Sequence, residues 1–245
     1  MEFPVYFWLG SWRIHPHFVF ESLAYAIAFR LALFNARKDT IAPTQRTSVI
    51  VGGMVGALIG AKVLVLLQHI YLAWQNWQQF LWLIIQGKTV VGAMLGGLIG
   101  VELTKKMIGL TRSTGDAFVY PLIVGTAIGR IGCFLTGLSD RTYGIATTLP
   151  WGVDFGDGIH RHPTQLYEIF FLLLLITFLK FRSNYARQEG DLFKFYMIAY
   201  LSFRLLVDFL KPDFHPILGF SAIQIACCLG LLYYFRSFAK LFRFT

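Results

Sequence analysis

Arg130 opens the stretch GRIGCFLTG (residues 129–137), which ends an apolar run that begins near Ala117. An arginine at the centre of a bilayer costs roughly 2.5–3.5 kcal/mol on insertion scales, so it needs a compensating partner. Within this run no carboxylate lies three or four residues away, and the partner must come from another helix or from a ligand. A planar guanidinium binds phosphate oxygens in two-pronged fashion, and the abundant phosphate of a membrane is a lipid headgroup.

A second arginine, Arg204, lies in the middle of the apolar stretch AYLSFRLLVDFL (199–210), with Asp208 one turn later. Two interpretations stay open: a buried ion pair within one helix, or a second guanidinium for the same anion. Lys62 and Glu102 also lie inside apolar runs, where charged residues are functional candidates by default.

The eight residues of RHPTQLYE (161–168) include Arg161, His162, Gln165, Tyr167 and Glu168. Pro163 suits the first turn of a helix, which would place Gln165 and Glu168 three residues apart on one face. Arg161 and His162 precede that helix, and a histidine can act as a general base near neutral pH. The alternative is a helix N-terminus that is merely rich in polar groups.

Histidines also occur at the start of the first apolar run, at His15 and His17. Together with His160, His162 and Asp140 they could in principle converge on a metal, but nothing in their spacing demands it. We therefore predict no metal site. Cys133 is interpreted as a small apolar filler, with a lipid carried covalently on its thiol as the alternative.

The chain that must position these groups has 245 residues, of which 56% are hydrophobic and 14% charged. Soluble domains carry about 25% charged residues, so this composition indicates a polytopic membrane protein. A net charge of +9 does not indicate nucleic-acid binding, because the basic residues form short patches between apolar runs. Spans of about 20 apolar residues predict seven transmembrane helices. They lie near 17–36, 48–69, 89–109, 117–137, 164–181, 193–210 and 217–236.

The basic residues between the spans predict the orientation, because cytoplasmic loops are enriched in lysine and arginine. Thirteen of them fall on one side: Arg37, Lys38, Arg46, Lys105, Lys106, Arg112, Lys180, Arg182, Arg187, Lys194, Arg236, Lys240 and Arg243. The other side has Arg13, Arg141, Arg161 and Lys211, with Lys88 near the boundary. The N-terminus is therefore expected outside and the C-terminus in the cytoplasm.

We expect one transmembrane domain over residues 1–245, of the all-α class. Residues 71–88, in which three tryptophans alternate with amides, suit an interfacial arm. Residues 138–163 form a long extracytoplasmic loop. Glycines in VGGMVGALIGAK (51–62) and VGAMLGGLIG (91–100) favour tight helix packing, and glycine would also let backbone approach a phosphate.

Taken together, the motifs GRIGCFLTG, RHPTQLYE and AYLSFRLLVDFLKPD resemble the prolipoprotein diacylglyceryl transferase family. The resemblance covers most of the chain and implies a seven-helix protein of the bacterial inner membrane. It also implies a reaction that needs no cofactor. A diacylglyceryl group passes from phosphatidylglycerol to the lipobox cysteine of a preprolipoprotein, and glycerol phosphate leaves.

By position, Arg130 and Arg204 resemble the family's two essential arginines, and Tyr200 resembles the tyrosine one turn before the second. The resemblance implies that the arginines hold the phosphate while His162, or else His17, serves as base. The candidates for substrate binding are Tyr200, Glu168, Gln165, Arg161, His17, Asp208, Gly132, Gly137 and Lys62.

Several positions depart from the family pattern. Leu95 replaces a histidine, Cys133 and Thr136 replace asparagines, and His17 replaces a tyrosine. A glutamate that the pattern places soon after Gly137 is missing. Two alternatives therefore stay open: a transferase with a phospholipid donor and a different acceptor, or a lipid-binding homologue without catalysis. A small-solute transporter is disfavoured because the two halves show no internal repeat.

Overall fold

A computed structural model of the chain describes residues 2–36, 41–183, 188–212 and 219–241. At positions 36, 86 and 236–241 only the backbone is described. Some of the predictions therefore lie outside the described residues: the basic residues Arg37, Lys38, Arg187 and Arg243, and the side chains of Arg236 and Lys240.

The chain divides into two compact units, and each has its own packing. Unit 1 comprises Met1–Asp39, Ser113–Ala199 and Phe209–Pro212. Unit 2 comprises Thr40–Arg112, Tyr200–Asp208 and Asp213–Thr245.

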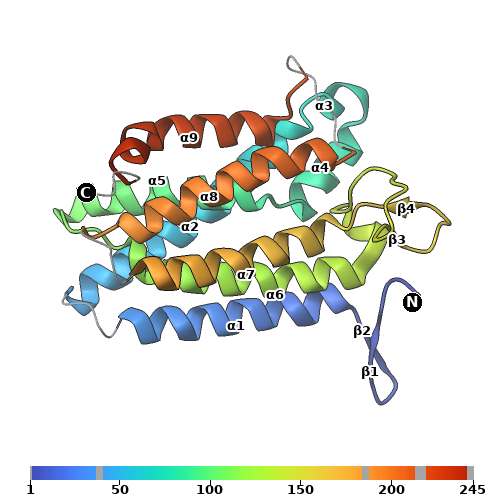
Figure 1. The fold of residues 1–245 in the computed structure, drawn as a ribbon, viewed down its shortest axis with the longest axis horizontal. Helices are drawn as coiled ribbons and strands as arrows, with labels where there is room; N and C mark the ends of the chain where they lie inside the picture. Colours follow the sequence, from blue (N-terminus) through green and yellow to red (C-terminus); the bar gives the residue numbers. More distant parts are fainter. Residues whose placement is uncertain (1, 37–40, 184–187, 213–218, 242–245) are drawn as a thin grey trace. The chain divides into compact units, whose positions relative to one another are not determined.

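Unit 1 is built on three long helices, α1 (Pro16–Ala36), α6 (Val119–Thr136) and α7 (Thr164–Ser183). Helix α6 packs on both α1 and α7 (Figure 1). The short helices η1 (Gly115–Phe118) and η2 (Gly137–Asp140) continue α6 at its two ends. Helix α8 (Asp191–Val207) begins in unit 1, where the Asp116 carboxylate accepts hydrogen bonds from the backbone N–H groups of Gly190 and Phe193.

Two small antiparallel hairpins in unit 1 were not predicted from the sequence. One pairs β1 (Phe7–Leu9) with β2 (Trp12–Ile14), and the other pairs β3 (Val153–Asp154) with β4 (His160–Arg161). Strands of two or three residues are too short to produce a recognisable alternation of polar and apolar residues. The second hairpin lies inside the 138–163 loop and sets the position of the residues just before α7.

Unit 2 contains α2 (Pro43–Gln68), α3 (Leu72–Gln75), α4 (Trp77–Gln86), α5 (Val90–Ile108) and α9 (Ala222–Leu241). It also contains the end of α8, which η3 (Asp208–Leu210) follows. Helices α2 and α5 meet through glycines. A Cβ at Gly96 would collide with the Gly56 carbonyl oxygen, and one at Gly92 with that of Gly60. This confirms the helix-packing interpretation of the two glycine-rich stretches.

The expected arm corresponds to the short helices α3 and α4. The side chains of Trp74, Trp77 and Trp82 are exposed there, as interfacial tryptophans would be. Helix α4 (Trp77–Ile85) meets α5 (Val90–Ile108) at a bend of 62°.

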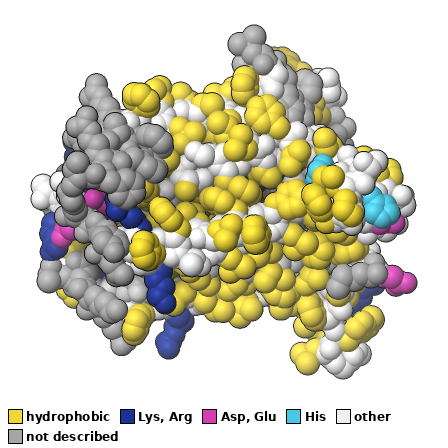
Figure 2. Space-filling view, in the orientation of Figure 1, with side chains coloured by type: hydrophobic (Ala, Val, Ile, Leu, Met, Phe, Trp, Pro, Cys, Tyr) yellow, Lys and Arg dark blue, Asp and Glu magenta, His cyan; other side chains and the backbone are white. Residues whose placement is uncertain are grey.

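Four helical segments among the described residues are long and apolar enough to cross a membrane: Pro16–Asn35, Pro43–Gln68, Gly115–Asp140 and Thr164–Ser183. If α4 and α5 together form one bent span, the number of candidate spans among the described residues is five. Ala222–Phe235 in α9 is a shorter apolar helix. Large apolar side chains such as Phe18 and Phe29 on α1 are exposed, and Figure 2 shows many such side chains on one face. The chain is an all-α membrane protein, since such surfaces suit lipid rather than water.

Neighbouring glycines on α5 provide a matched test of the α2–α5 contact. A Cβ at Gly96 meets the backbone of α2, whereas one at Gly97 makes only ordinary contacts at 3.5 Å and beyond. Gly96→Ala should therefore destabilise the protein by about 1–3 kcal/mol through overpacking. Gly97→Ala should be neutral or stabilising by about 0.5–1 kcal/mol, because alanine favours the helix. Unfolding of the purified protein in detergent measures both, and equal midpoints would contradict the contact.

Candidate functional site

The buried guanidinium of Arg130 is paired with a carboxylate from another helix. Its Nε lies 2.9 Å from Oε2 of Glu168, and the two side chains are only 9% and 2% exposed. Arg130 lies on α6 and Glu168 on the first turns of α7, so the pair joins the two helices. A carboxylate from α7 therefore compensates the buried charge of Arg130.

Helix α7 begins where the motif RHPTQLYE predicts, at Thr164, directly after Pro163. Gln165 and Glu168 are both buried, which confirms that they share an inward face. The Gln165 amide donates to the Thr142 hydroxyl at 3.0 Å, and that hydroxyl donates to Asp140. Threonine 142 therefore links the buried face of α7 to η2.

His162 is half-buried just before α7 and is held on two sides. Its backbone N–H donates to the Ile145 carbonyl, and its carbonyl accepts from the N–H of Gly144. Its Nδ1 lies 3.0 Å from the hydroxyl of Tyr167, which also accepts from the indole N–H of Trp151. These contacts fix the imidazole just before the start of α7.

Arg161 is used within the β3–β4 hairpin. Its Nη1 lies 2.6 Å from Oδ1 of Asp157, and the guanidinium lies over the ring of Tyr143. The hydrogen bond from Arg161 holds the pKa of Asp157 below its usual range, and the same hydrogen bond raises the pKa of Arg161. Backbone N–H groups, chiefly that of Gly156, lower the pKa of Asp154. The structure thus gives Arg161 a role in the loop rather than a contact at Arg130.

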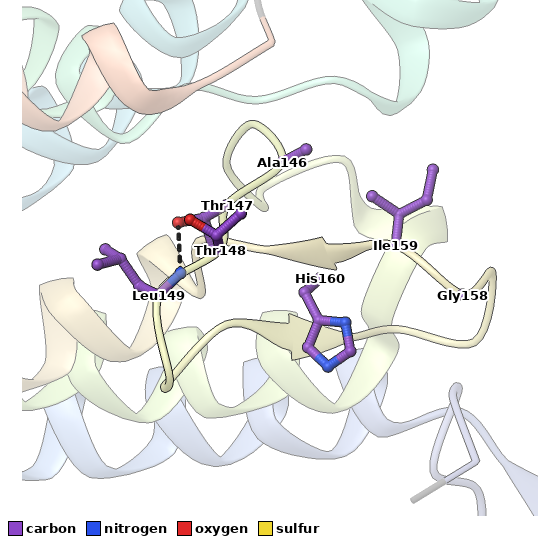
Figure 3. Close-up of a pocket in the computed structure, with 7 residues that line it drawn as sticks. All are labelled: Ala146, Thr147, Thr148, Leu149, Gly158, Ile159 and His160. Carbon is purple, nitrogen blue, oxygen red and sulfur yellow. Dashed lines mark hydrogen bonds between the residues drawn. The ribbon is translucent and has the colours of Figure 1, made fainter.

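An open hollow of about 730 Å³ lies on the same loop, lined by residues 146–149 and 158–160. Figure 3 shows the Thr147 hydroxyl accepting from the N–H of Leu149 beside it. His160 lines this hollow, whereas His162 does not, so the two histidines have different surroundings although they are two residues apart.

The first turn of α1 brings His17 close to Asp140, which Thr142 connects to Gln165 on α7. Its Nε2 lies 3.3 Å from Glu21 and its Nδ1 lies 3.3 Å from Asp140. His15, by contrast, is close to the ring of Tyr6, and burial followed by the charge of His17 lowers its pKa. Of the residues that could in principle converge, His17 and Asp140 therefore do lie together, although their spacing in the sequence did not require it.

Two glycines of GRIGCFLTG have structural uses. A Cβ at Gly132 would lie 2.7 Å from Cβ of Phe20, so this glycine lets α1 approach α6. Gly137 ends α6 with φ +70°, a conformation that favours glycine. Thr136 donates to the Gly132 carbonyl, and Cys133 is buried with its Sγ 3.8 Å from Nη1 of Arg130.

In unit 2, Arg204 and Asp208 lie one turn apart and both are buried. Arg204 Nη2 is 3.7 Å from Oδ1 of Asp208, and the Ser221 hydroxyl donates to the other oxygen of that carboxylate. Tyr200 is completely buried on α8. The ion pair that the sequence left open is present, and the link between Arg204 and Arg130 stays a prediction because they belong to different units.

The other charged candidates of unit 2 have structural partners. The Lys62 ammonium donates to the carbonyls of Ile84, Ile85 and Gly87 at 2.7–2.9 Å, which caps the C-terminal end of α4. Glu102 pairs with Lys105 at 3.0 Å near the end of α5. Leu95 lies where α9 Gly230 meets Leu201, so the position of the family's histidine is filled by apolar packing.

Comparison with known proteins gives one consistent family. The profile of the prolipoprotein diacylglyceryl transferases matches residues 4–240. A phosphatidylglycerol–prolipoprotein diacylglyceryl transferase of Clostridium tetani is 32% identical over 217 residues, covering 86% of each chain. The enzyme of the same name from Methylobacillus flagellatus is 34% identical, with 86% of this chain and 84% of its own covered. A Coxiella burnetii relative of that name is 32% identical over 89% of this chain and 85% of its own. The chain therefore belongs to the prolipoprotein diacylglyceryl transferase family.

Proposed function

We propose that this protein transfers the diacylglyceryl group of phosphatidylglycerol to the lipobox cysteine thiol of a preprolipoprotein and releases glycerol phosphate. Family membership supports the reaction. The observation that carries the proposal in this chain is the buried Arg130 guanidinium, joined to Glu168 at 2.9 Å. A buried cation held in a fixed orientation is suited to bind an anionic headgroup, whereas a helix contact alone would need only apolar side chains.

The proposed topology has seven spans in a single domain, with the N-terminus outside and the C-terminus in the cytoplasm. Helices occur at all seven predicted positions, and the excess of basic residues on one side supports this orientation. Residues 71–88 form the interfacial arm and residues 138–163 the extracytoplasmic loop. We place the protein in the bacterial inner membrane, where both the lipid donor and the preprolipoprotein are present.

Arg130 is proposed to bind the lipid phosphate while Glu168 sets its direction. A guanidinium presents five N–H donors in a rigid fork, so one edge can meet a carboxylate and the other a phosphate. The donors then stabilise the negative charge that grows on the phosphate oxygen as the C–O bond to the glyceryl carbon breaks. Arg204 is a further phosphate-binding candidate, and in unit 2 its partner Asp208 would orient it in the same way.

The nucleophile is the thiolate of the acceptor cysteine, and it requires a base. His162 is the proposed base, because it stands at the start of α7 and Tyr167 fixes its ring. The imidazole takes the thiol proton, sulfur bonds to the glyceryl carbon, and the ester oxygen leaves with glycerol phosphate. The proton then passes from the imidazolium to solvent or to the departing phosphate, which restores the base.

A second candidate function is the same lipid chemistry with a different acceptor. It is favoured by the apolar packing of Leu95, which leaves no polar group at the position where the family has histidine. Incubation of the purified protein with phosphatidylglycerol and a lipobox peptide separates the two. Glycerol phosphate release and a lipidated peptide support the first. Lipid that co-purifies without any turnover would indicate a binding protein and contradict both.

The carboxylate partner of Arg130 can be tested by a matched pair of variants. Glu168→Gln keeps the side chain's shape but removes the charge, and should lower kcat/KM on the order of 10²-fold by misplacing the guanidinium. Glu102→Gln, which removes an equivalent carboxylate at the partly exposed pair with Lys105, should leave turnover near wild type. Glycerol phosphate release is measured at matched amounts of folded protein. Equal turnover in the two variants would contradict the positioning role.

The proposed base has a control two residues away. His162→Gln should lower kcat about 10²–10⁴-fold, the contribution typical of a positioned base, with KM for the lipid little changed. His160→Gln alters the exposed histidine of the loop hollow and should leave kcat unchanged. The same assay over a range of pH serves as readout. Wild-type kcat in His162→Gln would move the role of base to another residue, with His17 as the next candidate.

A further inference from the structure

Three side chains with metal-ligating atoms meet at one end of unit 1. His17 comes from the first turn of α1, Cys133 from the last turn of α6 and Asp140 from η2. One ligating atom from each lies within 4.8 Å of the others. The sequence alone does not predict this cluster, because Cys133 has no metal-ligand spacing to His17 or Asp140 along the chain.

Two of the three ligating atoms, Nδ1 of His17 and Oδ1 of Asp140, are spaced as ligands of one metal ion, and the Cys133 Sγ, which also lies 3.8 Å from Nη1 of Arg130, is within 4.8 Å of both. Nδ1 of His17 is buried and makes no hydrogen bond among the described residues, although Oδ1 of Asp140 lies 3.3 Å away. Ligand atoms around a tetrahedral zinc ion lie about 3.3–3.7 Å apart, as follows from bond lengths of about 2.0–2.3 Å. The His17–Asp140 separation already falls in that range.

The surroundings of His17 also suit a metal ligand. Its other ring nitrogen, Nε2, lies 3.3 Å from the Glu21 carboxylate. An outer carboxylate on the second ring nitrogen is the usual partner of a metal-bound histidine, because it fixes the ring's tautomer and orientation. Asp140 is likewise held by the hydroxyl of Thr142.

From this arrangement we infer that His17, Cys133 and Asp140 bind a divalent transition-metal ion, with zinc the best match to one nitrogen, one sulfur and one oxygen ligand. On binding, the Cys133 thiol loses its proton to solvent and the thiolate bonds to the ion. The thiolate and the Asp140 carboxylate balance the two positive charges. The fourth position takes water or an anion. The ion ties the start of α1, the end of α6 and η2 together at the entrance to the 138–163 loop, and this inference does not rest on the proposed function.

Co²⁺ replaces zinc in such sites and makes the coordination visible. The purified full-length protein, stripped with a chelator, should bind one equivalent of Co²⁺ with the intense visible bands of four-coordinate cobalt and a near-ultraviolet thiolate charge-transfer band. Added Zn²⁺ should displace it. Cys133→Ser should abolish the charge-transfer band. Asp140→Asn should weaken Co²⁺ affinity by more than about tenfold, since loss of even an outer partner costs about 10–100-fold.

Two controls separate this site from non-specific binding and from misfolding. Cys228→Ser removes an exposed cysteine, and His160→Gln removes an exposed histidine. Both variants should keep the full Co²⁺ absorption spectrum. Zn²⁺ should raise the unfolding temperature of wild type and of both controls but not of Cys133→Ser or Asp140→Asn. No stoichiometric Co²⁺ or Zn²⁺ on the stripped wild-type protein, or an unchanged spectrum in Cys133→Ser, would overturn the inference.

Discussion

The buried ion pair between Arg130 and Glu168 is the interaction on which the rest of unit 1 depends. Removing a guanidinium and a carboxylate from water is costly, and their attraction compensates only where the geometry is good and both groups are otherwise satisfied. Nε of Arg130 lies 2.9 Å from Oε2 of Glu168, and both side chains are less than one-tenth exposed, so each charge offsets the other away from water. The pair also fixes α7 against α6 and thereby sets where the residues before α7 lie.

Further contacts hold the 138–163 loop against the start of α7. Thr142 and Gln165 connect the buried face of α7 to η2, and the backbone of His162 is bonded to residues 144 and 145. The β3–β4 hairpin adds the Arg161–Asp157 pair above them. The proposed role of His162 as base requires this kind of support, because proton transfer depends on hydrogen-bond geometry.

Helix positions were largely predictable because runs of about 20 apolar residues leave few alternatives, although only four or five segments among the described residues are long and apolar enough to cross a membrane, so the seven spans stay a prediction. The inward face of α7 was also predictable, from the spacing of Gln165 and Glu168. Contacts between distant segments were not. Nothing in the sequence pairs Arg130 with Glu168 rather than a lipid, assigns Lys62 to the end of α4, or brings Cys133 to His17. These depend on tertiary packing, as do hairpins two or three residues long.

The central proposal is that Arg130, oriented by Glu168, holds the headgroup phosphate of the lipid donor. An experimental structure of the protein in a phosphatidylglycerol bilayer tests it most directly. We expect a lipid phosphate within hydrogen-bonding distance of the Arg130 guanidinium while Glu168 stays on Nε. A headgroup bound elsewhere, with Arg130 contacting protein groups alone, would contradict the account and reduce the pair to a helix–helix contact.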